Sequence, residues 1–107
     1  MDARQRIEEL LKPDGEVIGE RPRAKSMVRR VTGGAEEARD LFESLAKLGW
    51  DAPVEEPSRG SNPGRLVEIS DLGYVGYRET PTPTIDVNVS IEGLRNVKFK
   101  FIGGAGA

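Results

Sequence analysis

The clearest pattern in this chain lies between residues 72 and 101, where apolar and polar positions alternate. The apolar positions are Ile85, Val87, Val89 and Ile91 in a first run and Val97, Phe99 and Phe101 in a second. A period of two is typical of a strand with one face on a core and the other toward water. Between the runs, Gly93 and Asn96 suit the positive φ angles of a turn. We therefore predict an antiparallel hairpin in which Ile91 lies opposite Val97.

Two shorter alternating runs precede the hairpin, at residues 66–70 and 74–78. The second run places Arg78 and one tyrosine on a common face. Residues 71–73 join the two runs tightly, which favours an antiparallel connection. Together the runs predict a three- or four-stranded antiparallel sheet with one face toward water.

Residues 35–48 form the clearest predicted helix. Its apolar residues recur at helical spacing, namely Ala38, Leu41, Phe42, Leu45 and Leu48. Glu36 and Glu37 suit the positive end of the helix dipole, and Gly49 suits its exit. This apolar stripe should pack on the sheet. We therefore predict an α+β fold with one principal helix on a four-stranded antiparallel sheet, and with an additional N-terminal helix.

The N-terminal helix is predicted from Asp2, which can cap it, to about Lys12, and residues 13–15 should end it. It is short and its apolar stripe is narrow. We therefore expect it to belong to a linker from a longer parent protein rather than to the core. The expected organisation is an N-terminal helix and linker at 1–26, an α+β domain at 27–102 and a flexible tail at 103–107.

Other segments carry weaker signals. Residues 16–20 and 26–31 are each predicted as a short strand, the second on the better pattern. Residues 51–65 are rich in Pro, Ser, Gly and Asn and are predicted as a loop. Trp50 is interpreted as a cover on the core, with stacking of a nucleobase as the alternative.

Composition narrows the possible chemistry. The 107 residues include no cysteine and no histidine, so catalysis would have to use carboxylate, lysine, arginine, tyrosine or hydroxyl groups. No metal-ligand spacing or phosphate loop is present, and we expect neither a metal nor a cofactor. The net charge of −2 argues against broad nonspecific binding of nucleic acid. No run is long enough to span a membrane. A basic cluster at residues 21–30 is interpreted as solvated surface, with phosphate binding as the alternative.

The polar positions of the predicted sheet form one constellation. They are Arg78, Thr84, Asp86, Asn88, Lys98 and Lys100. Polar residues fill the wet face of any antiparallel sheet, and that alone accounts for the pattern. A face that mixes a carboxylate with cations and hydroxyls can also bind a phosphodiester and deprotonate a ribose 2′-hydroxyl.

The chain also resembles a known family. The segments that carry the resemblance are, in order, Gly64-Arg65-Leu66-Val67, Gly73-Tyr74-Val75-Gly76-Tyr77-Arg78, Pro83-Thr84-Ile85-Asp86-Val87-Asn88 and Val97-Lys98-Phe99-Lys100-Phe101. Over residues 27–101 it is similar to C-terminal toxin domains of bacterial polymorphic toxins, the effector tips of Rhs-type and contact-dependent inhibition proteins. A group of these belongs to the barnase/EndoU/colicin/RelE-like ribonuclease class, in which a helix packs on a four-stranded antiparallel sheet whose open face cuts RNA.

The resemblance implies a function. The chain would be a toxin ribonuclease, with tRNA as its expected substrate, that uses metal-independent attack of a 2′-hydroxyl on the adjacent phosphate. The catalytic residues carried over by position are Arg78, Thr84, Asp86, Asn88, Lys98 and Lys100. Arg78 and Lys98 would bind phosphate, Thr84 and Asn88 would orient it, and either Asp86 or Lys100 would be the base. Candidate nucleic-acid contacts are Arg29, Arg30 and Tyr77.

The resemblance also implies partners and a location. A cognate immunity protein would cover the site and present carboxylates to its cations. A secreted parent protein would deliver the domain, which would act in the target-cell cytoplasm. The alternative function is a non-catalytic accessory domain that binds a protein or nucleic acid, and this accounts more easily for the acidic total.

Overall fold

The computed structural model describes residues 3–21, 23, 26–48, 54–57, 63–69, 71–79 and 82–103. The helices are α1 (Ala3–Leu11) and α2 (Ala35–Ala46), with a 3-10 turn at Pro13–Gly15. The strands are β1 (Val28–Gly33), β2 (Val54–Pro57), β3 (Pro63–Ile69), β4 (Gly73–Arg78), β5 (Thr84–Val89) and β6 (Val97–Gly103). Trp50 lies outside the described residues. In the described part of the chain, no helix is long and apolar enough to cross a membrane.

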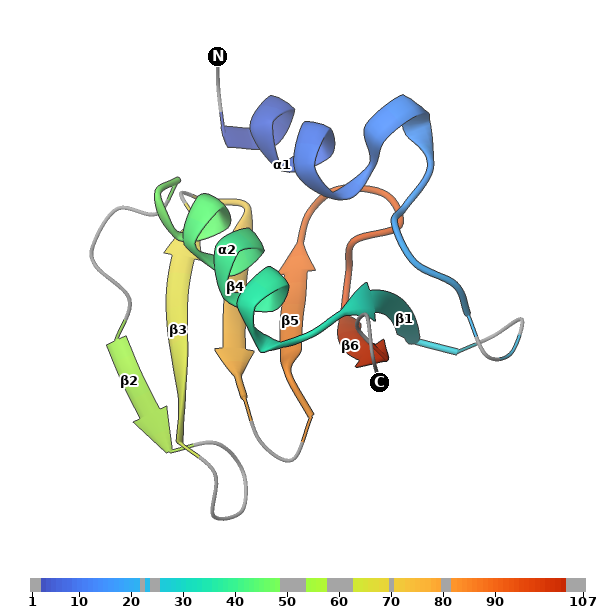
Figure 1. Ribbon diagram of the computed structural model, residues 1–107. Helices are drawn as coiled ribbons and strands as arrows, with labels where there is room; N and C mark the ends of the chain where they lie inside the picture. Colours follow the sequence, from blue (N-terminus) through green and yellow to red (C-terminus); the bar gives the residue numbers. More distant parts are fainter. Residues whose placement is uncertain are drawn as a thin grey trace.

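The six strands form one sheet in the order β1-β6-β5-β4-β3-β2 (Figure 1). The α+β class is confirmed, but the prediction of four antiparallel strands is wrong. β1 pairs in parallel with β6, and the other four pairings are antiparallel. β2 and the start of β3 occupy much of the segment predicted as a loop. β1 is parallel because the chain crosses through α2 before it enters the meander, so β1 joins no hairpin.

The β5–β6 hairpin differs from the prediction in its register. Val97 lies opposite Val87, four residues before the predicted partner Ile91. Ile91 leaves the ladder and, with Leu94, enters the core, where they are 3% and 0% exposed. The Val89 amide closes this connection by donating to the Leu94 carbonyl at 3.1 Å. Because the shift is even, every side chain keeps its predicted face and only its partner changes.

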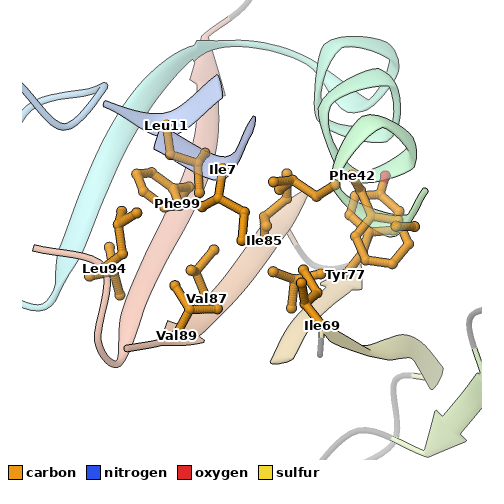
Figure 2. Close-up of a cluster of buried hydrophobic side chains, with 14 of the residues drawn as sticks. Ile7, Leu11, Phe42, Ile69, Tyr77, Ile85, Val87, Val89, Leu94 and Phe99 are labelled. Carbon is orange, nitrogen blue, oxygen red and sulfur yellow. The ribbon is translucent and has the colours of Figure 1, made fainter. Parts of the chain in front are cut away.

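The core lies between the sheet and the two helices, which pack on the same face (Figure 2). From α2, Phe42 and Leu45 are fully buried, as their spacing predicts. From α1, Ile7 and Leu11 are also 0% exposed and belong to the same cluster. Thus α1 is part of the core and not of a linker, contrary to expectation. Two buried residues one turn apart are enough to dock a helix whose apolar stripe is narrow.

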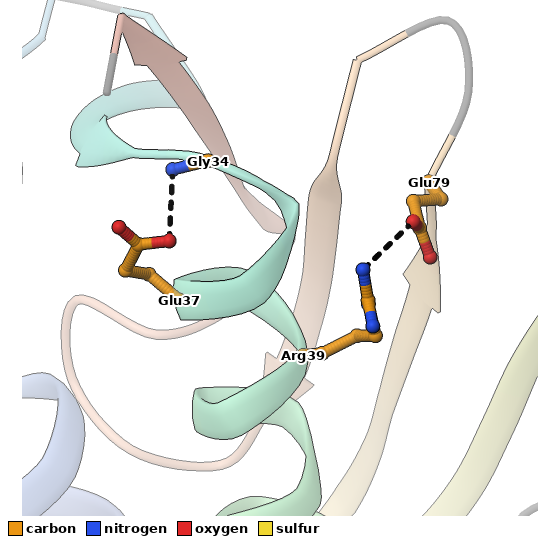
Figure 3. A network of polar contacts seen from close by, with 4 residues as sticks. All are labelled: Gly34, Glu37, Arg39 and Glu79. Atoms are coloured by element: carbon orange, nitrogen blue, oxygen red, sulfur yellow. Dashed lines mark hydrogen bonds and ion pairs between the residues drawn. The ribbon is translucent and has the colours of Figure 1, made fainter. Parts of the chain in front are cut away.

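Polar contacts fix both ends of α2. At its start, the Gly34 amide donates to Oε2 of Glu37 at 3.2 Å, which satisfies one of the free amides of the first turn (Figure 3). Farther along, Arg39 pairs with Glu79 at 3.3 Å, just beyond the end of β4. Glu43 pairs with Arg65 of β3 at 2.7 Å, and the Arg65 guanidinium lies 4.8 Å from the centre of the Phe42 ring. These contacts hold α2 across β3 and β4.

Candidate functional site on the open face of the sheet

The side of the sheet opposite α1 and α2, here called the open face, carries the candidate site. Residues paired across neighbouring strands project to the same face, so the register assigns each side chain. The polar residues on this face are Arg30 and Thr32 of β1, Lys98 and Lys100 of β6, Thr84, Asp86 and Asn88 of β5, Tyr74 and Arg78 of β4, and Glu68 of β3. The predicted grouping of six residues on one face is therefore confirmed, and their catalytic role stays a prediction.

Three cations lie in one row across this face. Arg30 is opposite Lys100, Lys100 is opposite Thr84, and Thr84 is opposite Arg78. Neighbouring strands are about 4.8 Å apart, so the backbone positions of Lys100 and Arg78 are about 10 Å apart. Among the described residues, these three side chains make no hydrogen bond or ion pair. We call Arg30, Lys100 and Arg78 the cationic row. Glu20 lies opposite Arg30 in an isolated bridge but makes no ion pair with it, so the positive charge of the row still makes this part of the face suited to an anion.

An ion pair occupies the next row. Nζ of Lys98 lies 2.8 Å from Oδ1 of Asp86, and both side chains reach solvent, at 45% and 28% exposure. The four-residue change of register creates this pair, because Lys98 was expected opposite Ser90. The second oxygen of the Asp86 carboxylate makes no hydrogen bond or ion pair in the described part of the chain, so it can still accept a hydrogen bond from a ligand hydroxyl.

Two of the predicted catalytic residues are already engaged. Thr84 is only 2% exposed, and its hydroxyl donates to the Thr82 carbonyl at 2.8 Å. It therefore cannot orient a phosphate, and this prediction is wrong. The Asn88 Oδ1 accepts from the Asn96 amide at 3.3 Å, where Asn96 turns with φ of 54°. The Asn88 amide nitrogen keeps its two donors for a ligand.

Arg29 does not belong to the open face. It projects with Phe99 toward the helix side, where its guanidinium donates to the carbonyls of Ile18, Val17 and Gly19 at 2.8, 3.1 and 2.9 Å. Burial, and to a smaller extent the charge of Arg21, lowers the pKa of Arg29 from its ordinary value. The prediction that Arg29 contacts nucleic acid is therefore wrong. Arg30 is exposed on the open face, and its contact with nucleic acid stays a prediction.

Tyr77 is not available to a ligand either. Its ring is 6% exposed and stacks on Phe42 with 5.4 Å between ring centres. Its hydroxyl is buried and, among the described residues, has no hydrogen-bond partner. Burial, and then the carboxylate of Glu79, raises the pKa of Tyr77 above its ordinary value. The tyrosine on the open face is Tyr74, which is 37% exposed. The alternation of 74, 76 and 78 already contained this signal, because Tyr74 shares its parity with Arg78.

The chain was compared with protein-family models, curated proteins and solved structures, and none of the three comparisons found a match. In the described residues, no group of three or more acidic side chains is arranged to hold a metal ion. The functional argument therefore depends on the residues of the open face.

Proposed function

We propose that the open face binds the phosphate backbone of RNA and that the protein is a ribonuclease of the toxin type it resembles. The observation that supports this best is the cationic row, which lies beside a carboxylate on a face that no described helix covers. The total charge of −2 does not oppose binding, because the local field at the row decides where a phosphate lies.

The reaction would be an internal transfer at phosphorus. The ribose 2′-oxygen attacks the adjacent phosphorus and the bond from phosphorus to the 5′-oxygen breaks, which leaves a 2′,3′-cyclic phosphate and a 5′-hydroxyl. Asp86 takes the proton of the 2′-hydroxyl, and the Lys98 ammonium gives one to the departing 5′-oxygen. Arg78 and Lys100 stabilise the charge that develops on the phosphate oxygens. Lys98 and Asp86 lie on adjacent strands and contact each other at 2.8 Å. In-line displacement needs the base and the acid on opposite sides of the phosphorus, so the bound phosphodiester would have to separate this pair.

Cleavage of tRNA and of unstructured RNA by the purified protein tests the proposal. We expect products with cyclic phosphate ends in the presence of a chelator. Asp86→Asn should lower the cleavage rate by about 100-fold or more, the usual range for a lost acid or base, while RNA binding stays within a few fold. Lys100→Ala should weaken binding, and the control Lys47→Ala, at an exposed lysine just after α2, should change neither quantity. RNA that stays intact at every pH tested would exclude the enzyme.

A second function, binding without chemistry, is favoured by a different observation. Thr84 and Asn88 are engaged within the protein, and Lys98 and Asp86 neutralise each other. In that case the cationic row alone would attract RNA. On a single strand, the logarithm of the binding constant would fall with the logarithm of the salt concentration. The slope would be about −0.7 per phosphate contact, or about −2 for three contacts. Salt-dependent binding of RNA that is never cut would identify this function.

The toxin resemblance supports two further proposals. A secreted parent protein delivers the domain to a target-cell cytoplasm, and an immunity protein presents carboxylates to Arg78, Lys98 and Lys100. Expression of the chain in a bacterium should arrest growth, and Asp86→Asn should relieve the arrest. Charge reversal at Lys98 and Lys100 should slow association with the immunity protein and reduce its salt dependence. Unchanged association would mean that the partner binds elsewhere.

A further inference from the structure

One aromatic side chain on the open face is exposed to solvent. Tyr74 of β4 lies between Glu68 of β3 and Asn88 of β5. It is 37% exposed, while the other large apolar side chains exposed in the described residues, Met27 and Ile102, are not aromatic. A tyrosine ring offers a flat surface that is apolar on its face and polar at its tip.

The charge of the open face changes along β4. Arg78 stands at one end, in the cationic row, and Tyr74 at the other, beside the exposed carboxylate of Glu68. The two positions are four residues apart, or about 13 Å on an extended strand. Gly76 lies between them and has no side chain, but it is buried, with the side chain of Leu66 of β3 beside it. The next strand places Asp86 beside Gly76.

The positive end of β4, its middle and its aromatic end follow one another as the phosphate, the ribose and the base do in a nucleotide. A phosphate is attracted to Arg78 and repelled by Glu68. The ribose would then lie over Leu66 and Gly76 and beside Asp86, where the proposed reaction needs its 2′-hydroxyl. The base would reach Tyr74, with the Glu68 carboxylate as an acceptor and the Asn88 amide nitrogen as a donor for its edge.

We propose that Tyr74 stacks an unpaired base, so that the open face takes single-stranded rather than duplex RNA. The inference rests on the proposed binding of RNA to the cationic row and adds the form of RNA that is bound. A base inside a duplex is already stacked between its neighbours and cannot lie flat on Tyr74, whereas an unpaired base can do so whatever its identity.

Binding of a fluorescent 2′-O-methyl RNA octamer tests this, because the probe lacks the attacking hydroxyl and cannot be cut. It is compared with the same octamer in a duplex and with an abasic octamer that keeps every phosphate. Tyr74→Ala should weaken binding of the octamer by roughly 5- to 150-fold, the range for loss of one stacked base. Binding of the abasic octamer should not change, and Tyr74→Phe should restore most of the affinity. Duplex should bind less tightly than the single strand.

Arg78→Ala provides the contrast. It should weaken octamer and abasic octamer alike and reduce the salt slope by about 0.7, whereas Tyr74→Ala should leave the slope unchanged. If Arg78→Ala acts in this way but Tyr74→Ala binds the octamer like the wild type, or duplex binds as tightly as single strand, the stacking inference is wrong and RNA binding stands. If the wild type binds no octamer at low salt, both proposals fail. Tyr74 lies on the surface, so unfolding midpoints equal to the wild type should accompany these variants.

Discussion

Replacing Arg29 by methionine should destabilise the fold, whereas the same change at its neighbour Arg30 should not. Arg29 donates three hydrogen bonds to the carbonyls of residues 17–19, at 2.8 to 3.1 Å. These bonds hold the segment between α1 and β1 beside the sheet, where Glu20 makes a bridge to the Arg30 backbone. Methionine keeps a long apolar stem but offers no donor, so three carbonyls lose their partner together.

The size of the loss follows from these contacts. A hydrogen bond to a charged group contributes about 1.5–3 kcal/mol when it is well shielded. Arg29 is only half-buried, the freed carbonyls regain some water, and the variant no longer orders an arginine at a cost of up to about 2 kcal/mol. We expect a net loss of about 2–4 kcal/mol in the free energy of unfolding. For a chain of 107 residues, this lowers the melting temperature by roughly 9–18 °C.

Urea unfolding and thermal melts of Arg29→Met, Arg29→Lys and Arg30→Met measure the effect. The lysine should recover only part of the loss, because one ammonium cannot match the planar fork of donors. Arg30→Met should stay within about 0.5 kcal/mol of the wild type, as exposed substitutions usually do, yet weaken RNA binding. Hydrogen exchange at the amides of residues 18–20 should speed up only in the Arg29 variants. Equal stabilities for Arg29→Met and Arg30→Met would refute the assignment of Arg29.

Three further predictions concern the core and the sheet. Tyr77→Phe removes a buried hydroxyl that has no hydrogen-bond partner in the described part of the chain, and it should leave stability unchanged or raise it by about 1 kcal/mol at pH 7. Burial raises the pKa of Tyr77, so on raising the pH the unfolded chain loses the tyrosine proton before the folded protein does. The wild type should therefore lose stability above about pH 10, and Tyr77→Phe should lose less. Identical urea midpoints for the two proteins across about pH 9–11 would contradict this. Leu11→Ala should cost about 2–5 kcal/mol in urea unfolding, and the half-buried neighbour Leu10→Ala clearly less; equal small losses would place α1 outside the core. Gly73→Ala should cost more than about 4 kcal/mol, since a Cβ there, at φ of 147°, meets the Asn88 carbonyl, while Gly15→Ala, with open space around it, should cost about 1–2 kcal/mol; similar melts for both would refute the close approach.

Much of the candidate site was predictable because alternation is a local property. Asp86, Lys98 and Lys100 share a face with Arg78 in any register that differs by an even number of residues. The same reasoning identified α2, whose apolar spacing and acidic first turn lie within a single segment. The alternation also places Tyr74, and not Tyr77, on the same face as Arg78. The prediction that Tyr77 contacts nucleic acid disregarded this difference.

The partner of each side chain depended on contacts that no local pattern contains. Lys98 pairs with Asp86 because Ile91 and Leu94 gain more by entering the core than by extending the ladder. Arg29 and Arg30 are adjacent and chemically identical, yet one holds the chain and the other faces solvent, because residues 17–19 pass along only one side of β1.

The sequence by itself therefore determined which side chains lie together on the open face, since the period of a strand is set by its own backbone. Only the tertiary structure decided which of them remain available to a ligand. Thr84 is buried, the turn that follows β5 engages Asn88, and a parallel edge strand distant in the chain adds Arg30 to the cationic row. The strand pattern does not determine these contacts, because it describes each strand separately. They form only when the strands and helices pack into one core, and burial of that core supplies the free energy that stabilises them.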